Sequence, residues 1–303
     1  MKISVVISAR NEESKLGRCL ASVAWADEVV VIDNSSTDGT ARIAREFGAK
    51  VFRRPNNLML NVNKNFGFEK ASGDWIFSLD ADEEVTKDLA KEIQERVMSK
   101  EQSDSSGYWI PRKNIIFGKW ITHGLWWPDK QLRIFRRSKG RFPCVHVHEY
   151  LEVDGSTKEL TEPYVHYNYE TISQFIRKMD TIYSESEVQK LIRTNYQWTW
   201  HDAIRFPVSD FVKVFFAQEG YKDGLHGLML AMLQAFYSFV VFAKLWEQSK
   251  FEQKELTVGG IDGELQRNHR EIRYWVLSEQ IKETRSIIEK IRLKLLRRYG
   301  KSH

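Results

Sequence analysis

The start of the chain alternates apolar runs with segments whose apolar residues recur every three or four positions. The runs lie at 3–7, 28–32, 50–52 and 75–79 and are rich in β-branched residues, as buried parallel strands are. The amphipathic segments between them predict helices. This order predicts an α/β fold, a doubly wound and mostly parallel sheet with helices on both faces. Ligands of such sheets bind at the carboxyl ends of the strands.

After about residue 100 the pattern changes to shorter strand-like pieces, at 108–112, 115–117, 131–135 and 150–153. Tryptophans are dense here, as in a wall that faces an acceptor, although aromatics at sheet edges are more often plain core. We assign residues 1–170 to one α/β domain.

An uncharged segment at 227–243 raises the question of a membrane. It is shorter than the roughly 20 apolar residues that a spanning helix needs, so the alternatives are a buried core helix, a span, or a helix lying in the interface. The preceding segment 206–216 mixes apolar residues with Lys213, and Lys222 and Lys244 flank the uncharged run. This pattern favours the interface.

The chain from residue 171 on is helical in pattern. We predict a membrane-associated helical region at 171–250 and a charged helical tail at 251–303, in which 275–299 forms one long helix. The basic end of the tail can attract anionic lipids or pair with a second subunit, giving a homo-oligomer through the C-terminal helix. A solvated helix packed on its own domain is the plainer alternative.

Composition narrows the class of partner. The 303 residues are 42% hydrophobic, enough for a full core. A formal charge of +5 suits phosphate-bearing ligands or an anionic membrane, and we expect no nucleic acid. The two cysteines are far apart and form no CxxC, so neither a zinc ribbon nor a redox pair is indicated, and a reduced compartment fits. The apolar run at 3–7 is too short for a signal peptide.

Two carboxylates follow the fourth predicted strand directly. Asp80 and Asp82 at the carboxyl end of a strand can address one hard cation, Mg²⁺ or Mn²⁺, with a ligand's phosphates completing the shell. Glu83 and Glu84 come next, and acids at the N-terminus of a helix explain these two better than they explain Asp80.

Asp33 ends the second predicted strand and can accept hydrogen bonds from a base or a ribose, or can cap the following helix. Several rival motifs do not occur: GxxxxGK[ST], GxGxxG after the first strand, HExxH and GxSxG. Their absence disfavours P-loop enzymes, dehydrogenases, zinc proteases and serine hydrolases.

Four motifs now stand in a fixed order at strand or helix ends: SARNE at 8–12, VVVIDNSSTDGT at 29–40, NKNFG at 63–67 and SLDADE at 78–83. In this order the chain resembles the inverting family 2 glycosyltransferases, which have a GT-A fold.

The likeness continues at 127–136, 147–149 and 223–227, which are similar to the bacterial branch containing lipopolysaccharide-core β-1,4-glucosyltransferases. It covers residues 1–246. It implies a UDP-sugar donor, a glycolipid or lipopolysaccharide-core acceptor, and a peripheral or monotopic place on the cytoplasmic face of a bacterial inner membrane.

The resemblance also implies roles for particular residues. Asp33 binds the uracil or ribose, Asp80 contacts the ribose and the metal shell, and Asp82 holds Mg²⁺ or Mn²⁺. Lys64 stands where the family has an arginine near the base, so a point charge replaces a planar fork. The remaining assignments are Ser8, Arg10, Asn11 and Glu12 to the nucleotide pocket and His166 to the metal.

An inverting transfer also needs a base for the acceptor hydroxyl. The family's usual Glu-Asp pair followed by aromatics is not seen, so we choose Glu149, after His148, with Asp129 second. The plainer reading of Glu149 is a surface acid beginning a strand.

The function predicted from the sequence is inverting transfer of a hexose, glucose from UDP-glucose, to a lipid-linked sugar. The alternatives are a nucleotidyltransferase acting on sugar phosphates, which also uses paired aspartates and a metal, and a non-catalytic sugar-nucleotide-binding scaffold.

Overall fold

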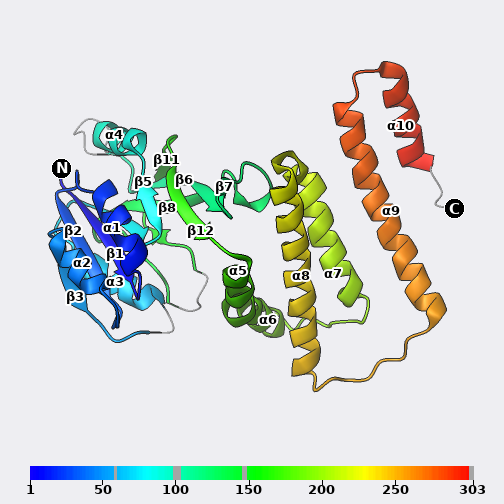
Figure 1. Ribbon diagram of the computed structural model, residues 1–303, viewed down its shortest axis with the longest axis horizontal. Coiled ribbons are helices and arrows are strands. Elements are labelled where there is room, and N and C mark those ends of the chain that lie inside the picture. Colours follow the sequence, from blue (N-terminus) through cyan, green and yellow to red (C-terminus); the bar gives the residue numbers. More distant parts are fainter. Residues whose placement is uncertain (58–59, 98–103, 145–148, 300–303) are drawn as a thin grey trace. The chain divides into compact units, whose positions relative to one another are not determined.

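The computed structural model describes residues 1–57, 60–97, 104–144 and 149–299 (Figure 1). The chain divides into two compact units. The first consists of Met1–Trp120 and Trp126–Glu170, and the second of Ile121–Leu125 and Thr171–His303.

A mixed sheet forms the first unit, with strand order β3-β2-β1-β4-β8-β6-β12-β5. The predicted parallel half is present, because β1 pairs with β2 and β4, and β2 with β3, all in parallel. Its strands are β1 Ile3–Ala9, β2 Glu28–Asp33, β3 Lys50–Arg53 and β4 Trp75–Asp80. The helices that connect or follow them are α1 Glu13–Ser22, α2 Thr40–Glu46, α3 Leu60–Lys70 and α4 Lys87–Arg96.

Beyond β4 the sheet is mixed: β8 Lys130–Arg136 pairs antiparallel with both β4 and β6, whereas β6 pairs in parallel with β12. The two pieces expected at 108–112 and 115–117 are one strand, β6 Gly107–Ile116. The strands at the far end of the sheet, β5 Glu83–Val85 and β12 Tyr164–Tyr169, were not predicted. Shorter pieces are β7 Lys119–Trp120, β9 Gly140–Arg141, β10 Glu152–Val153 and β11 Thr157–Glu159.

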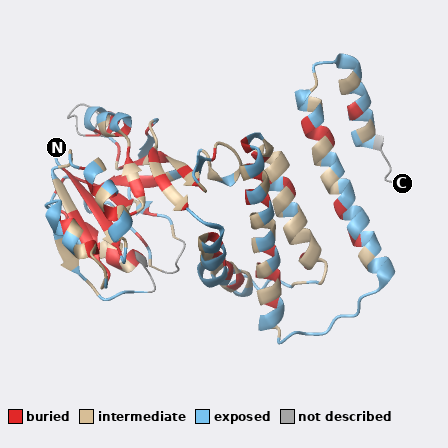
Figure 2. Cartoon of the chain, viewed as in Figure 1, coloured by how far each residue is buried: buried red, intermediate tan, exposed pale blue. Residues whose placement is uncertain are grey.

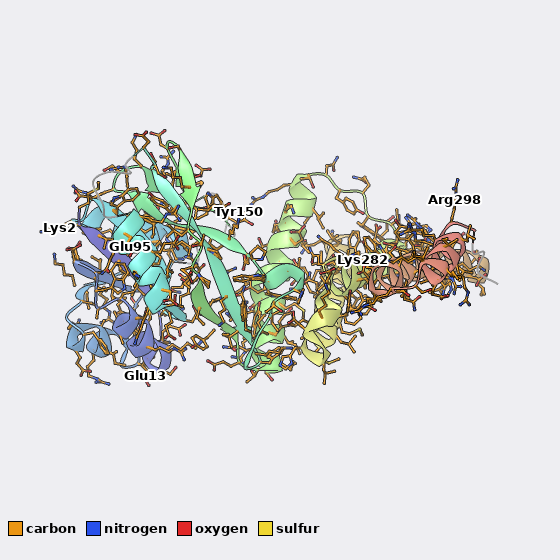
Figure 3. All side chains as sticks on the ribbon, turned by 90° about the horizontal axis from the view of Figure 1, so that it is seen from above. Lys2, Glu13, Glu95, Tyr150, Lys282 and Arg298 are labelled. Atoms are coloured by element: carbon orange, nitrogen blue, oxygen red, sulfur yellow. The ribbon has the colours of Figure 1, made fainter. Side chains whose placement is uncertain are left out.

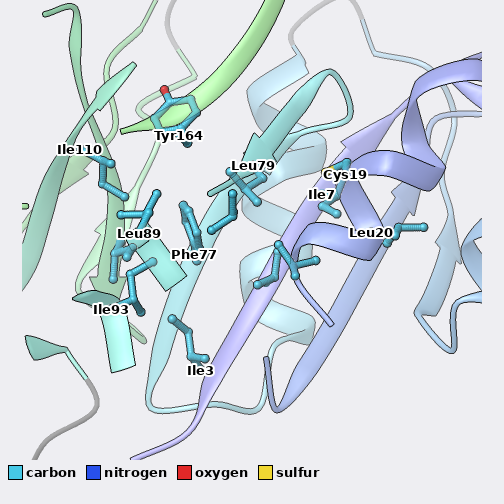
Figure 4. Close-up of a cluster of buried hydrophobic side chains, with 14 of the residues drawn as sticks. Ile3, Ile7, Cys19, Leu20, Phe77, Leu79, Leu89, Ile93, Ile110 and Tyr164 are labelled. Atoms are coloured by element: carbon cyan, nitrogen blue, oxygen red, sulfur yellow. The ribbon is translucent and has the colours of Figure 1, made fainter. Parts of the chain in front are cut away.

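Buried residues concentrate on the strands of the first unit (Figure 2), and the apolar ones form a cluster on each face of the sheet. On one face, residues of α1, α2 and α4 pack on β1 and β4, with Ile7, Phe77 and Leu89 among the fully buried ones (Figure 4). On the other face α3 packs through Phe68. Gly67 lets this helix approach closely, because a Cβ there would lie 2.5 Å from a side-chain methyl of Val6.

The second unit is helical, as predicted. Its helices are α5 Ile172–Lys178, α6 Ser184–Arg193, α7 Asp202–Val212, α8 Leu225–Gln248, α9 Val258–Glu283 and α10 Ile287–Tyr299, with π-helical turns at Met179–Tyr183 and Lys213–Ala217. The prediction of one long helix at 275–299 is wrong, since the helix breaks at 284–286. The hydroxyl of Ser286 accepts a hydrogen bond from the Glu289 N–H and so begins a new helix.

Helix α8 is the one described helix that is long and apolar enough to cross a membrane, judged by length and composition. The helix extends beyond the uncharged run 227–243 at both ends. Only 39% of its most apolar 18-residue stretch is buried. The buried part packs on α7 and α6.

Asp223 holds the short excursion Ile121–Leu125 within the second unit. Its carboxylate accepts hydrogen bonds from the Thr122 N–H, from the Thr122 hydroxyl at 2.9 Å and from the His123 N–H at 2.8 Å. Asp223 is 3% exposed, so these bonds are shielded from water.

Candidate active site

The register of the parallel strands sets three predicted residues side by side. Ala9 is paired with Asp33 across β1 and β2, and Ser8 is paired with Asp80 across β1 and β4. Neighbouring strands lie about 4.8 Å apart, so Asp33 and Asp80 end strands that are separated by roughly 10 Å. That span is at the carboxyl edge of the sheet, where α/β folds bind their ligands.

The loops after β1 and β2 are bonded to each other. The Asn11 side-chain oxygen accepts from the Thr37 N–H at 2.8 Å, and the Asn11 N–H donates to the Ser36 hydroxyl at 3.0 Å. The Glu12 N–H donates to the Thr40 hydroxyl at 2.8 Å. Arg10 is exposed beside them. These contacts hold the two loops in one conformation along the edge of the sheet.

Two buried asparagines extend this framework, and neither was assigned a role from the sequence motifs that contain them. Asn63 on α3 donates to the side-chain oxygen of Asn34 at 2.7 Å, and Asn34 donates to the Ser8 hydroxyl at 2.9 Å. Asp33 is 2% exposed and accepts from the Ser36 N–H. The motif NKNFG at 63–67 therefore contains a residue, Asn63, whose hydrogen bond supports the loop after β2.

Asp80 lies between two cations. Lys64 of α3 is 2.6 Å from one carboxylate oxygen, and the buried Arg133 is 3.2 Å from the other. Burial acts to raise the pKa of Asp80, but the charges of Lys64 and Arg133 outweigh it and hold the pKa well below its usual range. Asp80 is therefore ionised at neutral pH, and Lys64 contacts it rather than Asp33.

Arg133 also binds Glu83, at 2.6 Å, and Glu83 is buried. The sequence suggested that Glu83 belongs to a helix N-terminus. It lies instead in β5 and pairs with His166 across to β12. Arg133 thus links the carboxylates that flank Asp82 and fixes the backbone around it.

His166 faces Asp82, with 3.7 Å between its Nε2 and a carboxylate oxygen. Its Nδ1 is 2.8 Å from the side-chain oxygen of the fully buried Asn114. Asn114 uses its NH₂ group to donate to Asp129 and to the Trp126 carbonyl, so its oxygen is left to accept from His166. This assigns the proton to Nδ1 and turns the lone pair of Nε2 toward Asp82.

Asp82 and His166 fit a divalent cation as a pair. Two ligand atoms each about 2.1 Å from one ion can lie at most about 4.2 Å apart, which admits the observed 3.7 Å. Among the described residues no group of three or more His, Cys, Asp or Glu side chains is arranged to hold a metal. Such a sparse set suits an ion that takes its other ligands from a bound diphosphate and water.

Asp129, the second choice as base, is engaged by several donors. Arg112 binds it at 2.6 Å, and the side-chain amides of Asn114 and Gln131 donate to it at 3.0 Å and 2.8 Å. Burial acts to raise the pKa of Asp129, but these partners outweigh it and lower the pKa. The carboxylate therefore orients Asn114 and is a poor proton acceptor.

Glu149, the first choice as base, is half-buried near α3. Its carboxylate accepts from the Cys144 N–H at 2.6 Å and lies 3.3 Å from the amide of Asn61. Asn61 and Lys64 are three residues apart on α3 and so neighbour each other on its surface. Helix α3 thus contacts both carboxylates, Glu149 through Asn61 and Asp80 through Lys64. His148 lies outside the described residues.

With this geometry in view, comparison with known proteins identifies the family. A glycosyltransferase from Rickettsia bellii, itself described as uncharacterized, is 32% identical over 260 residues, 82% of this chain and 87% of that protein. The family model "Glycosyl transferase family 2" matches residues 4–150. The chain belongs to glycosyltransferase family 2. It is thus a glycosyltransferase, and the predicted GT-A fold is confirmed.

Within family 2, the chain is related to a lipopolysaccharide core biosynthesis glycosyltransferase, LpsC of Rhizobium meliloti, with 27% identity over 256 residues, 82% of this chain and 93% of LpsC. Among solved structures it is similar to residues 1–349 of TarS from S. aureus, with a TM-score of 0.42 and 19% identity, over 86% of this chain and 95% of that chain.

Proposed function

We propose that this family 2 enzyme transfers a hexose, glucose from UDP-glucose, with inversion to a sugar of a lipid-linked, lipopolysaccharide-core-like acceptor, aided by Mg²⁺ or Mn²⁺. The observation that carries the proposal is the row of Asp33, Ser8 and Asp80 along the sheet edge, with Asp82 and His166 beside it. The strand ends that carry Asp33 and Asp80 are roughly 10 Å apart.

The charge balance at the site supports the proposal that a divalent cation takes part. The two positive charges of Lys64 and Arg133 are already matched by the acidic groups of Asp80, Asp82 and Glu83, although burial raises the pKa of Glu83. A diphosphate with two further negative charges would be repelled unless a divalent cation came with it. When bound, that cation neutralises the diphosphate as it leaves. Asp82 and His166 would hold it, while Asp80 stays with its cations.

The chain's own residues supply the proton transfer. The acceptor hydroxyl oxygen forms a bond to the anomeric carbon while the bond from that carbon to the diphosphate oxygen breaks. Glu149 takes the hydroxyl proton, and UDP leaves with the electron pair. We assign this role to Glu149 because Asp129 is neutralised by Arg112 and its pKa is lowered. Asp33, Arg10, Asn11 and Glu12 border the nucleotide.

The exposed apolar residues of the second unit support the proposal that the acceptor is lipid-linked. Helix α8 exposes a stripe of large apolar side chains at alternating steps of four and three residues: Leu225, Met229, Met232, Phe236 and Phe239. Such a stripe suits the interface of a membrane. It supports the proposal that the enzyme lies peripherally on the cytoplasmic face of the bacterial inner membrane.

The test is release of UDP from UDP-glucose with a sugar acceptor, with and without Mn²⁺. Asp82→Asn should abolish the metal-stimulated rate, and Glu149→Gln should lower kcat by about 10²-fold or more with little change in donor KM. Exposed acids, Asp88→Asn and Glu152→Gln, serve as matched controls. Full wild-type turnover in strong chelator would refute the metal role.

The rival functions give different products. A nucleotidyltransferase releases pyrophosphate rather than UDP. A non-catalytic scaffold is stabilised against heat by the UDP-sugars that it binds but turns over none of them. A panel of nucleotide sugars, each with and without Mn²⁺, separates these outcomes and identifies the preferred hexose.

A further inference from the structure

Helix α10 packs on α9 with one side only. Leu293 is 8% exposed on this side, and Leu277 of α9 is 7% exposed. The guanidinium of Arg297 donates to the Ser278 hydroxyl at 3.0 Å and lies 5.3 Å from the ring centroid of Tyr274. These contacts fix which side of α10 faces α9.

The opposite side of α10 is apolar and exposed. Ile287 is 75% exposed, Ile288 81%, Ile291 54% and Leu295 53%. At about 100° per residue these four side chains lie within an arc of about 100°. An apolar arc of this size on a short helix is typical of a surface that meets a partner or a membrane.

Basic residues border this arc. On the same helical geometry, Lys290 and Lys294 lie along one edge and Arg292 along the other, and Arg298 extends near its end (Figure 3). The one acid of α10, Glu289, lies away from the arc and is 3.1 Å from Arg292. Five cations against one acid give the helix a strongly positive charge.

This charge decides between the surfaces that could cover the arc. A second copy of α10 would bring two strongly positive helices together around a shared apolar seam, which is unfavourable. Nucleic acid would match the charge but offers no apolar layer. An anionic bilayer offers both, because the isoleucines can enter the acyl boundary while the lysine stems run along it and keep their ammonium groups among the headgroups.

We infer that α10 is an interfacial helix that binds anionic lipid surfaces through Ile287, Ile288, Ile291 and Leu295, with Lys290 and Lys294 recognising the headgroup charge. This goes beyond the hydrophobic contact proposed for α8, since it adds a preference for the lipid headgroup. It does not depend on which sugar the enzyme transfers.

The test is sedimentation of the full-length protein with vesicles of phosphatidylcholine alone or mixed with phosphatidylglycerol. The wild type should bind the mixed vesicles more tightly. Ile288→Glu with Ile291→Glu should weaken binding to mixed vesicles by about tenfold or more. Leu265→Glu is a matched control, because Leu265 on α9 is 53% exposed and outside the arc. Lys290→Gln with Lys294→Gln should remove the preference for phosphatidylglycerol.

Equal binding by the wild type and the Ile288→Glu, Ile291→Glu variant would overturn the inference. So would light scattering that shows this variant turning a dimer into a monomer while its vesicle binding stays unchanged, which would assign the arc to a second copy. No donor or acceptor is present in the assay. Failure here therefore leaves UDP release intact, and failure of the transferase proposal leaves vesicle binding intact.

Discussion

At the scale of single residues, Asn114 is a positioning residue: it orients the proposed metal ligand His166 and does not itself contact a substrate. It fixes the tautomer of His166 and is itself oriented by Asp129. The sequence offered no sign of this, because Asn114 lies in a strand among unrelated polar residues. Its partner His166 is 52 positions away in the sequence, and the two side chains meet only when the sheet is formed.

Asn114→Leu should weaken Mn²⁺ binding in the presence of UDP by about 10- to 100-fold, since outer-shell partners of a metal-binding histidine have effects of this size. Mn²⁺ titration followed by electron paramagnetic resonance measures it. UDP binding without metal is the internal control and should change little. An unaltered Mn²⁺ titration would show that His166 needs no help from Asn114.

Glu28 controls part of the acid stability. Burial acts to raise its pKa, but Lys50 at 2.6 Å, Ser4 and the Ser72 N–H lower it to about 2 from 4.5. Because the folded pKa is depressed, Glu28 stabilises the fold above about pH 4.5, by up to about 3 kcal/mol, and this is lost as pH falls toward 2.

Glu28→Gln should therefore lower the free energy of unfolding at pH 7 and flatten its fall between pH 5 and pH 3. Urea unfolding at a series of pH values measures both. A variant whose acid limb is as steep as that of the wild type would contradict the assignment.

At the scale of elements, periodicity predicted the first four strands and their helices because each buries a regular apolar face. It missed β5, whose sequence EEV looks like exposed acid, and β12, whose sequence YVHYNY alternates weakly. Glu83 is buried because Arg133, 50 residues later, neutralises it, and no local pattern carries that information. The position of Asp33 and Asp80 at strand ends could be predicted because it follows from the apolar runs of the parallel strands alone.

The contact of α3 with the sheet depends on Gly67. A Cβ there would meet Val6 at 2.5 Å and Ile32 at 3.0 Å, both in a packed layer, so Gly67→Ala should destabilise the protein by about 1–3 kcal/mol. Gly259→Ala is the control, because nothing lies within 4 Å of its Cβ position in α9 and alanine favours helix. Thermal unfolding compares them, and equal stability would show that α3 can shift.

At the scale of the whole molecule, the chain crosses between its two units at 120–121, 125–126 and 170–171. A cut at residue 170, which the sequence pattern suggested, would leave the segment Ile121–Leu125 without Asp223. The sequence could not show this, because a five-residue excursion has no periodicity.

Asp223→Ala should release that segment, since it removes several charge-assisted hydrogen bonds worth about 1.5–3 kcal/mol each to a buried acceptor. Limited proteolysis should then cut within 121–125 much faster than in the wild type. Unchanged cleavage would mean that other contacts hold the segment.

The two cysteines have unequal surroundings. Cys19 is buried, whereas Cys144 is partly exposed and its N–H binds Glu149, and burial raises the pKa of both thiols. A thiol-directed fluorophore will accordingly mark one position, next to the proposed base, without any engineered cysteine. Once labelled, the enzyme with its natural sequence would carry an optical reporter beside the proposed base.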